Sequence, residues 1–173
     1  MHVLLIVKDS YHDVKLYIPG PYNIKNGKLL KTVSGFEKWL YNYIEQNNLS
    51  ENIVFTGKLN IEEMAYYYEK CNIFVSPSCM EVHSGSLREA LCVGIPSISS
   101  LCGCVGDLIK HGVNGYIYRY EEEEILAFYI NKLFANELLA KSFSLLSKEC
   151  IQKYDYNEKF ETLERIYHFI NEK

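Results

Sequence analysis

The stretch IFVSPSCMEVHSGSLREALCVGIPSISS, residues 73–100, carries the pattern that decides the fold. It begins with one apolar run, Ile73–Ser76, and closes with another, Ile95–Ser99. Between them, small polar residues precede a segment with helical periodicity that ends near Val93. Two short apolar runs joined through a helix predict two parallel strands and their crossover helix.

Similar apolar runs occur on both sides of this stretch, at Val14–Ile18, Ile53–Thr56 and Gly115–Tyr118. They are nearly continuous rather than alternating, which is typical of parallel strands buried on both faces. Helical segments separate them, and the chain from about Glu121 is helical. The order predicts an α/β fold with a doubly wound, Rossmann-like parallel sheet.

Local signals refine this outline. The apolar run Val3–Val7 has the composition of a strand, but only six residues separate it from the strand that begins at Val14, which is too short a connection for a parallel crossover. We therefore expect a helix over residues 3–11. The residues Tyr22–Thr32 are predicted to form one exposed loop. An apolar stripe near the end of the chain predicts an amphipathic helix packed on the sheet. Capping boxes, which mark helix starts, are predicted at Ser34–Glu37, Asn60–Glu63 and Ser86–Glu89.

Size and composition favour one compact domain over residues 1–173, because the chain is 48% hydrophobic. Its net charge of -4 and the lack of a long basic run argue against a nucleic-acid partner. The sequence has no run of about 18 apolar residues, so no membrane span is predicted. The N-terminus does not resemble a signal peptide. The six cysteines and five histidines lack metal-ligand spacing, so reduced cytosolic thiols and no metal site are expected.

A ligand site is predicted beyond the strand that ends at Ser76, since ligands bind beyond the carboxyl ends of strands in such sheets. A helix beginning near Ser84–Ser86 would offer open backbone amides and its positive dipole end to a phosphate or diphosphate. Glu89, about one turn into that helix, can accept hydrogen bonds from a vicinal diol such as a ribose. Glu81 would hold sugar hydroxyls in the same cleft, which together describes a nucleotide-sugar site.

Structural interpretations of the two carboxylates remain open at this point. Glu89 is also the residue that would complete a capping box with Ser86, and the capping and binding roles can coexist. Glu81 is alternatively a solvated loop carboxylate.

The same segment resembles the signature of retaining glycosyltransferases of family four, also described as glycosyl transferases group one. In that family a Pro-Ser pair ends a strand, and two glutamates follow with seven residues between them and alanine after the second. Here these are Pro77-Ser78, Glu81 and Glu89-Ala90. Three further segments resemble family elements in the correct order, so the likeness spans roughly residues 14–120: Val54–Gly57, Gly94–Ile98 and His111–Tyr116.

The resemblance implies the C-terminal, donor-binding half of a two-domain GT-B enzyme that transfers a hexose with retention from a UDP- or GDP-linked donor. It implies neither a metal nor a cofactor, because helix amides and basic side chains neutralise the diphosphate. Glu81 would be the catalytic residue beside the donor sugar, and Glu89 would bind the ribose. The remaining donor-binding residues implied are His83, Ser84, Gly85, Ser86, Gly57, Lys58 and Leu59.

The chain departs from the family pattern in two respects. The family glycine at the position of Ser84 occurs one place later, at Gly85. The Gly-Arg and Lys-Gly elements of the first strand, and the N-terminal acceptor domain, are missing. The chain alone is therefore expected to be an incomplete enzyme, whose glycan or lipid-linked acceptor would be bound by that missing domain.

The expected location is cytoplasmic, with a peripheral membrane position as an option for the full-length enzyme. The alternative function is a non-catalytic nucleotide-sugar-binding module or partner subunit. A nucleotide-sugar epimerase of the same architecture would lack this pair of glutamates.

Overall fold

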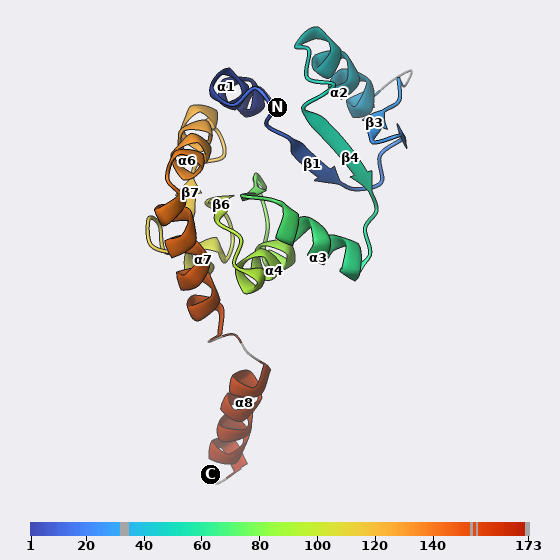
Figure 1. Ribbon diagram of the computed structural model, residues 1–173. Coiled ribbons are helices and arrows are strands. Elements are labelled where there is room, and N and C mark those ends of the chain that lie inside the picture. Colours follow the sequence, from blue (N-terminus) through green and yellow to red (C-terminus); the bar gives the residue numbers. More distant parts are fainter. Residues whose placement is uncertain (32–34, 153, 155, 172–173) are drawn as a thin grey trace. The chain divides into compact units, whose positions relative to one another are not determined.

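The computed structural model describes residues 1–31, 35–152, 154 and 156–171 (Figure 1). The chain divides into two compact units. The first contains residues 1–67 and 123–131, and the second contains residues 68–122 and 132–173. Strands and helices alternate along the chain, and the α/β class is confirmed. Each of the five predicted apolar runs coincides with a strand, and the boundaries differ by no more than two residues at either end.

The first unit begins with α1 (His2–Ser10), which confirms the helix predicted over residues 3–11. Strand β1 (Leu16–Pro19) pairs in parallel with β4 (Ile53–Gly57), and Leu16 lies opposite Ile53. Helix α2 (Gly35–Gln46) precedes β4. The core is formed by buried residues of these elements and their connections: Leu4, Leu29, Leu40, Ile44, Leu49, Ile53 and Phe55.

The described part of the segment predicted as an exposed loop, Tyr22–Lys31, contains a hairpin, so that prediction is wrong. Strands β2 (Ile24–Lys25) and β3 (Lys28–Leu29) pair antiparallel around Asn26 and Gly27. Both turn residues have positive φ, 52° and 75°, which a two-residue hairpin turn requires and an Asn-Gly pair readily adopts. Leu29 is buried in the core, and this burial adds to the turn in stabilising the hairpin.

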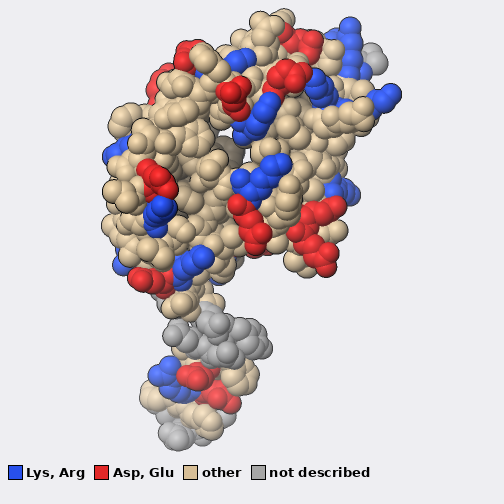
Figure 2. Space-filling model, in the orientation of Figure 1, with Lys and Arg blue, Asp and Glu red and all other residues tan. Residues whose placement is uncertain are grey.

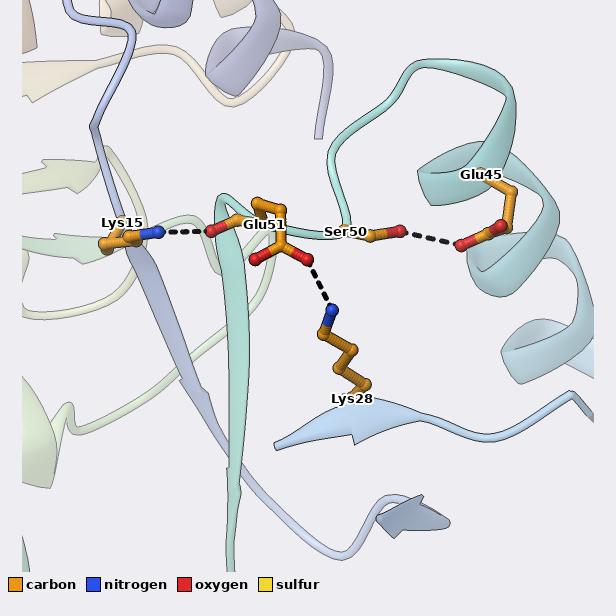
Figure 3. Close-up of polar contacts among 5 residues, drawn as sticks. All are labelled: Lys15, Lys28, Glu45, Ser50 and Glu51. Carbon is orange, nitrogen blue, oxygen red and sulfur yellow. Dashed lines mark hydrogen bonds and ion pairs between the residues drawn. The ribbon is translucent and has the colours of Figure 1, made fainter. Parts of the chain in front are cut away.

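Polar contacts tie the hairpin and β1 to the turn before β4 (Figure 3). The Lys28 ammonium forms an ion pair with the Glu51 carboxylate, and the Lys15 ammonium donates to the Glu51 carbonyl. The hydrogen bond and charge of Lys28 lower the pKa of the Glu51 carboxyl. Both side chains of the ion pair are largely exposed, so the pair contributes little to stability and mainly orients the turn.

The second unit contains the three-stranded sheet β5-β6-β7, in which both pairings are parallel. Its strands are β5 (Phe74–Ser76), β6 (Ser97–Ser100) and β7 (Tyr116–Tyr118). Helix α4 (Gly85–Val93) connects β5 to β6, and α5 (Val105–Leu108) connects β6 to β7. All four residues of β6 are buried, as the continuous apolar pattern predicts for a central parallel strand. A cluster of five buried apolar residues packs around α4 and α5: Leu87, Leu91, Val105, Leu108 and Ile109.

Two helices cross the boundary between the units, α3 (Ile61–Lys70) and α6 (Glu123–Ala135). The chain closes with α7 (Glu137–Gln152) and α8 (Tyr156–Asn171), which confirms the predicted helical C-terminal part. The expected packing of the last helix on the sheet is wrong for its described side chains. Its apolar residues are exposed, namely Phe160, Leu163, Ile166, Tyr167, Phe169 and Ile170.

The surface mixes both signs of charge. Figure 2 shows lysine and arginine side chains interspersed with aspartate and glutamate over the face in view. Among the residues that the structure describes, no helix combines the length and the apolar character that crossing a bilayer requires.

The loop that follows β6 packs directly on the loop that follows β5. The Ser100 hydroxyl donates to the carbonyl oxygens of Ser76 and Ser78, and the Cys104 amide donates to the Val82 carbonyl at 3.4 Å. A Cβ atom at Gly103 would lie 1.8 Å from the Glu81 carbonyl oxygen, and Gly103 has φ of 48°. Only glycine fits between these two backbones, so Gly103 determines where the Glu81 loop lies.

We predict that Gly103→Ala lowers the free energy of unfolding by about 2 to 4 kcal/mol, because the new methyl group collides with backbone and the positive φ is strained. Urea unfolding followed by circular dichroism measures this change. Gly106→Ala is the matched control, since nothing lies within 4 Å of its added Cβ and Gly106 is in helix α5. Equal stability of the two variants would show that the loops do not constrain one another.

A second prediction concerns Asn114, whose side chain is fully buried in the turn before β7. Its Oδ1 accepts from the Lys110 amide at 2.7 Å, and its Nδ2 donates to the Leu108 carbonyl at 3.1 Å. Asn114→Ala leaves both backbone groups unsatisfied, so the free energy of unfolding should fall by about 2 to 4 kcal/mol. The exposed Asn42→Ala serves as control in the same urea titration, and a loss at Asn114 no larger than at Asn42 would contradict the assignment.

Candidate functional site

Helix α4 begins with its side-chain cap turned inward. Ser84 is the N-cap residue, is 1% exposed, and its hydroxyl accepts a hydrogen bond from the Leu87 amide at 3.3 Å. The amides of Gly85 and Ser86, in the first turn, have no acceptor within the helix. Nothing lies within 4 Å of a Cβ built on Gly85, so a ligand can approach these amides closely.

The predicted capping box Ser86–Glu89 is wrong. The helix starts at Gly85, one residue before Ser86, and the hydroxyl that caps it belongs to Ser84. The Glu89 carboxylate accepts a hydrogen bond from the Tyr68 hydroxyl instead. The box at Asn60–Glu63 is confirmed, because the Asn60 amide donates to Glu63 and the Glu63 amide donates to Asn60. The third box includes Ser34, which lies outside the described residues.

Tyr68, near the end of α3, is a site residue that the sequence reasoning missed. It is 8% exposed, and its ring packs edge-on against Phe74 with 5.9 Å between centroids. Its hydroxyl lies 3.1 Å from Glu89 Oε2 and 3.2 Å from the Ser86 carbonyl oxygen. Burial, followed by the Glu89 hydrogen bond, raises the pKa of the Tyr68 phenol, so the group remains a neutral donor.

Glu81 and His83 lie on the loop between β5 and α4. Glu81 is half-buried and His83 is exposed. Within the described part of the chain, no hydrogen bond to the Glu81 carboxylate is observed, which leaves it available to a ligand. The close approach of Gly103 fixes the backbone at Glu81. The Glu81 carboxylate therefore lies on a loop that the neighbouring loop holds in place, a braced loop.

The predicted residues near the base lie at the end of β4, in the first unit, whereas all other predicted site residues lie in the second. Gly57 has φ of 78°, and its carbonyl accepts from the Gly20 amide at 2.9 Å. Lys58 is exposed and Leu59 is half-buried. The structure therefore gathers Glu81, His83 and the start of α4 in one unit, and leaves the contribution of residues 57–59 as a prediction.

The start of α4 combines two kinds of binding group. The open amides and the positive end of the helix dipole favour an anion such as a phosphate. The exposed Glu89 carboxylate has the acceptor capacity to bind two adjacent hydroxyl groups of a ligand. Across the described residues, no cluster of three or more histidine, cysteine, aspartate or glutamate side chains has the arrangement of a metal site. All six cysteines are free thiols.

Comparison with known proteins identifies the family. The family model of glycosyl transferases group 1 matches residues 2–149. An uncharacterized glycosyltransferase of Methanocaldococcus jannaschii is 27% identical over 144 residues, which cover 83% of this chain and 39% of that protein. The chain thus spans well under half the length of the curated relatives it matches.

Solved structures agree on the fold. The C-terminal domain of a glycosyl transferase group 1 protein (LpcC) from Francisella tularensis superposes with a TM-score of 0.74 at 19% identity, over 89% of this chain and 76% of that one. HepE of Anabaena in complex with UDP superposes with a TM-score of 0.75 at 21% identity, over 95% and 45% of the two chains. The neighbours have the GT-B fold, in agreement with the predicted Rossmann-like half. With most of its length matched by the family model, this chain belongs to the glycosyl transferases group 1.

Proposed function

We propose that this chain is the donor-binding, C-terminal half of a retaining GT-B glycosyltransferase of family four, and that it binds a UDP- or GDP-linked hexose. The observation that carries the proposal is the start of α4, where open first-turn amides are followed by an exposed carboxylate at Glu89. The diphosphate would lie on the amides of Ser84, Gly85 and Ser86. The bound UDP of the similarly folded HepE supports this choice of ligand class.

Each carboxylate has its own role in the proposal. Glu89 accepts hydrogen bonds from the two ribose hydroxyls. Glu81, on the braced loop, holds donor-sugar hydroxyls beside the reacting carbon, with His83 nearby on the same loop. Gly57, Lys58 and Leu59 contact the base. The inward cap of Ser84 matters here, because its hydroxyl is engaged by Leu87 and does not fill the space before the amides.

The reaction transfers the hexose from the diphosphate to an acceptor hydroxyl. The bond between the anomeric carbon and the diphosphate oxygen breaks, and a bond to the acceptor oxygen forms on the same face. The proton of the acceptor hydroxyl passes to an oxygen of the departing diphosphate. The negative charge that develops on the departing diphosphate is stabilised by the α4 amides and dipole. This electrostatic stabilisation takes the place of a metal ion in the proposed site.

The acceptor is a glycan or a lipid-linked sugar, bound by a second domain outside these 173 residues. The short coverage of the curated relatives supports this division, as does the similarity to an isolated C-terminal domain. A cytoplasmic location, peripheral to the membrane in the full-length enzyme, completes the proposal. The six free thiols fit a reducing compartment.

Nucleotide binding tests the proposal directly. Calorimetric titration of the chain with UDP and with GDP should show saturable binding of one of them. Glu89→Ala should weaken that binding about tenfold, because two hydrogen bonds from the ribose to a charged acceptor are lost.

The control is Glu124→Ala, which removes an exposed carboxylate from the first turn of α6. Its affinity should equal that of the wild type. A folded wild-type chain that binds neither nucleotide would refute the proposed donor site, and so would unchanged affinity in Glu89→Ala.

The role of Glu81 is distinguished from that of Glu89 by comparing the affinities for a free nucleotide and for a nucleotide sugar. Glu81→Ala should weaken binding of UDP-hexose or GDP-hexose about fivefold to tenfold, since hydroxyl-carboxylate hydrogen bonds are lost. Binding of the corresponding UDP or GDP should stay unchanged, because those contacts reach only the sugar. Isothermal calorimetry with both ligands provides the measurement, and equal losses for the two would rule out a sugar-specific role.

A further inference from the structure

The hydroxyl of Tyr68 joins two parts of the candidate site that belong to different turns of α4. The Tyr68 hydroxyl oxygen lies 3.2 Å from the carbonyl oxygen of Ser86, whose amide lies in the first turn. It lies 3.1 Å from Oε2 of Glu89 in the next turn. A phenol has a single proton, so it shares that proton between a neutral carbonyl and a charged carboxylate, and the carboxylate is the stronger acceptor.

The surroundings of Tyr68 make this hydroxyl a fixed donor. The side chain is 8% exposed and its ring is braced by Phe74, the first residue of β5. Burial raises the pKa of the phenol, so the proton stays on the oxygen across the ordinary pH range. Glu89, by contrast, is exposed and would otherwise sample several rotamers in water.

The hydrogen bond leaves Glu89 with free acceptor capacity. A carboxylate offers about four lone-pair positions on its two oxygens, and Tyr68 occupies one of them on Oε2. In the part of the chain that the structure describes, Oε1 of Glu89 makes no hydrogen bond. The carboxylate is thus held from one side while its other oxygen can take up donor groups of a ligand.

We propose that Tyr68 is a positioning residue that holds Glu89 for the vicinal hydroxyls of the nucleotide's ribose, and that it thereby sets selectivity for a ribose over a sugar lacking those hydroxyls. This inference rests on the proposed function and concerns a residue outside the glutamate pair. Its physical basis is preorganisation, because a carboxylate already fixed by a buried donor loses less rotamer freedom when the ligand binds.

The test compares two ligands in the full chain. Tyr68→Phe retains the ring that packs on Phe74 and removes only the hydroxyl. We expect the affinity for UDP or GDP, whichever binds the wild type, to fall about tenfold. The affinity for the 2′,3′-dideoxy form of the same nucleotide should stay unchanged, since that ligand has no hydroxyls for Glu89 to bind. A merely structural role would weaken both ligands alike.

Two further variants complete the experiment. Tyr66→Phe removes the same atom from an exposed position of the same helix and should leave both affinities unchanged. Glu89→Ala should abolish the difference between the two ligands, and adding Tyr68→Phe to it should weaken binding no further. Circular dichroism melting confirms that each variant is folded.

The outcomes separate the inference from the proposed function. A wild type that prefers the ribonucleotide, with a Tyr68→Phe variant that keeps this preference, would overturn the role of Tyr68 and leave the donor site intact. Equal loss of both ligands would also overturn it. A wild type that binds no nucleoside diphosphate would refute the proposed function itself.

Discussion

Strand β6 is hydrogen-bonded to β5 on one side and to β7 on the other, and all four of its residues are buried. In this parallel register Ser76 lies opposite Ser99, and Ser100 lies opposite Tyr118. The carboxyl ends of the three strands therefore meet at one edge. Because the strands end together, the loops after β5 and β6 must share the space beyond that edge. The packing of these two loops against each other determines the shape of the candidate site.

Neutral hydrogen bonds join the ends of β5 and β6 and the loops that follow them. The Ser100 hydroxyl, at the end of β6, donates to the carbonyl oxygens of Ser76, at the end of β5, and of Ser78 in the following loop, and Gly103 allows the two loop backbones to touch. The next hydroxyl, that of Ser84, caps α4 from inside. These neutral groups satisfy backbone polar atoms locally. They leave the first-turn amides and the two carboxylates, Glu81 and Glu89, as groups that a ligand can engage.

Local patterns do not say which partner a polar group will find, and this explains two differences between the predicted and the observed site. A serine three residues before a glutamate indicates a capping box, yet at Ser86–Glu89 the glutamate is bound by a tyrosine 21 residues earlier in the chain. Helical periodicity places Tyr68, the last of three consecutive tyrosines, on an apolar stripe, but it does not reveal that the hydroxyl bonds Ser86 and Glu89 of α4. The hairpin around Asn26-Gly27 is a separate case, because an Asn-Gly pair is itself a local signal for a two-residue turn.

The sequence by itself determined the α/β class, the positions of the five parallel strands, the start of α4 near Ser84 and the family likeness. These depend on the spacing of apolar residues and on short motifs, which are local properties of the chain. The tertiary structure alone decided the inward cap at Ser84, the contact between Gly103 and Glu81, and the hydrogen bond from Tyr68 to Glu89. These contacts join residues from separate elements or depend on where a helix begins, so the local spacing of residues does not reveal them.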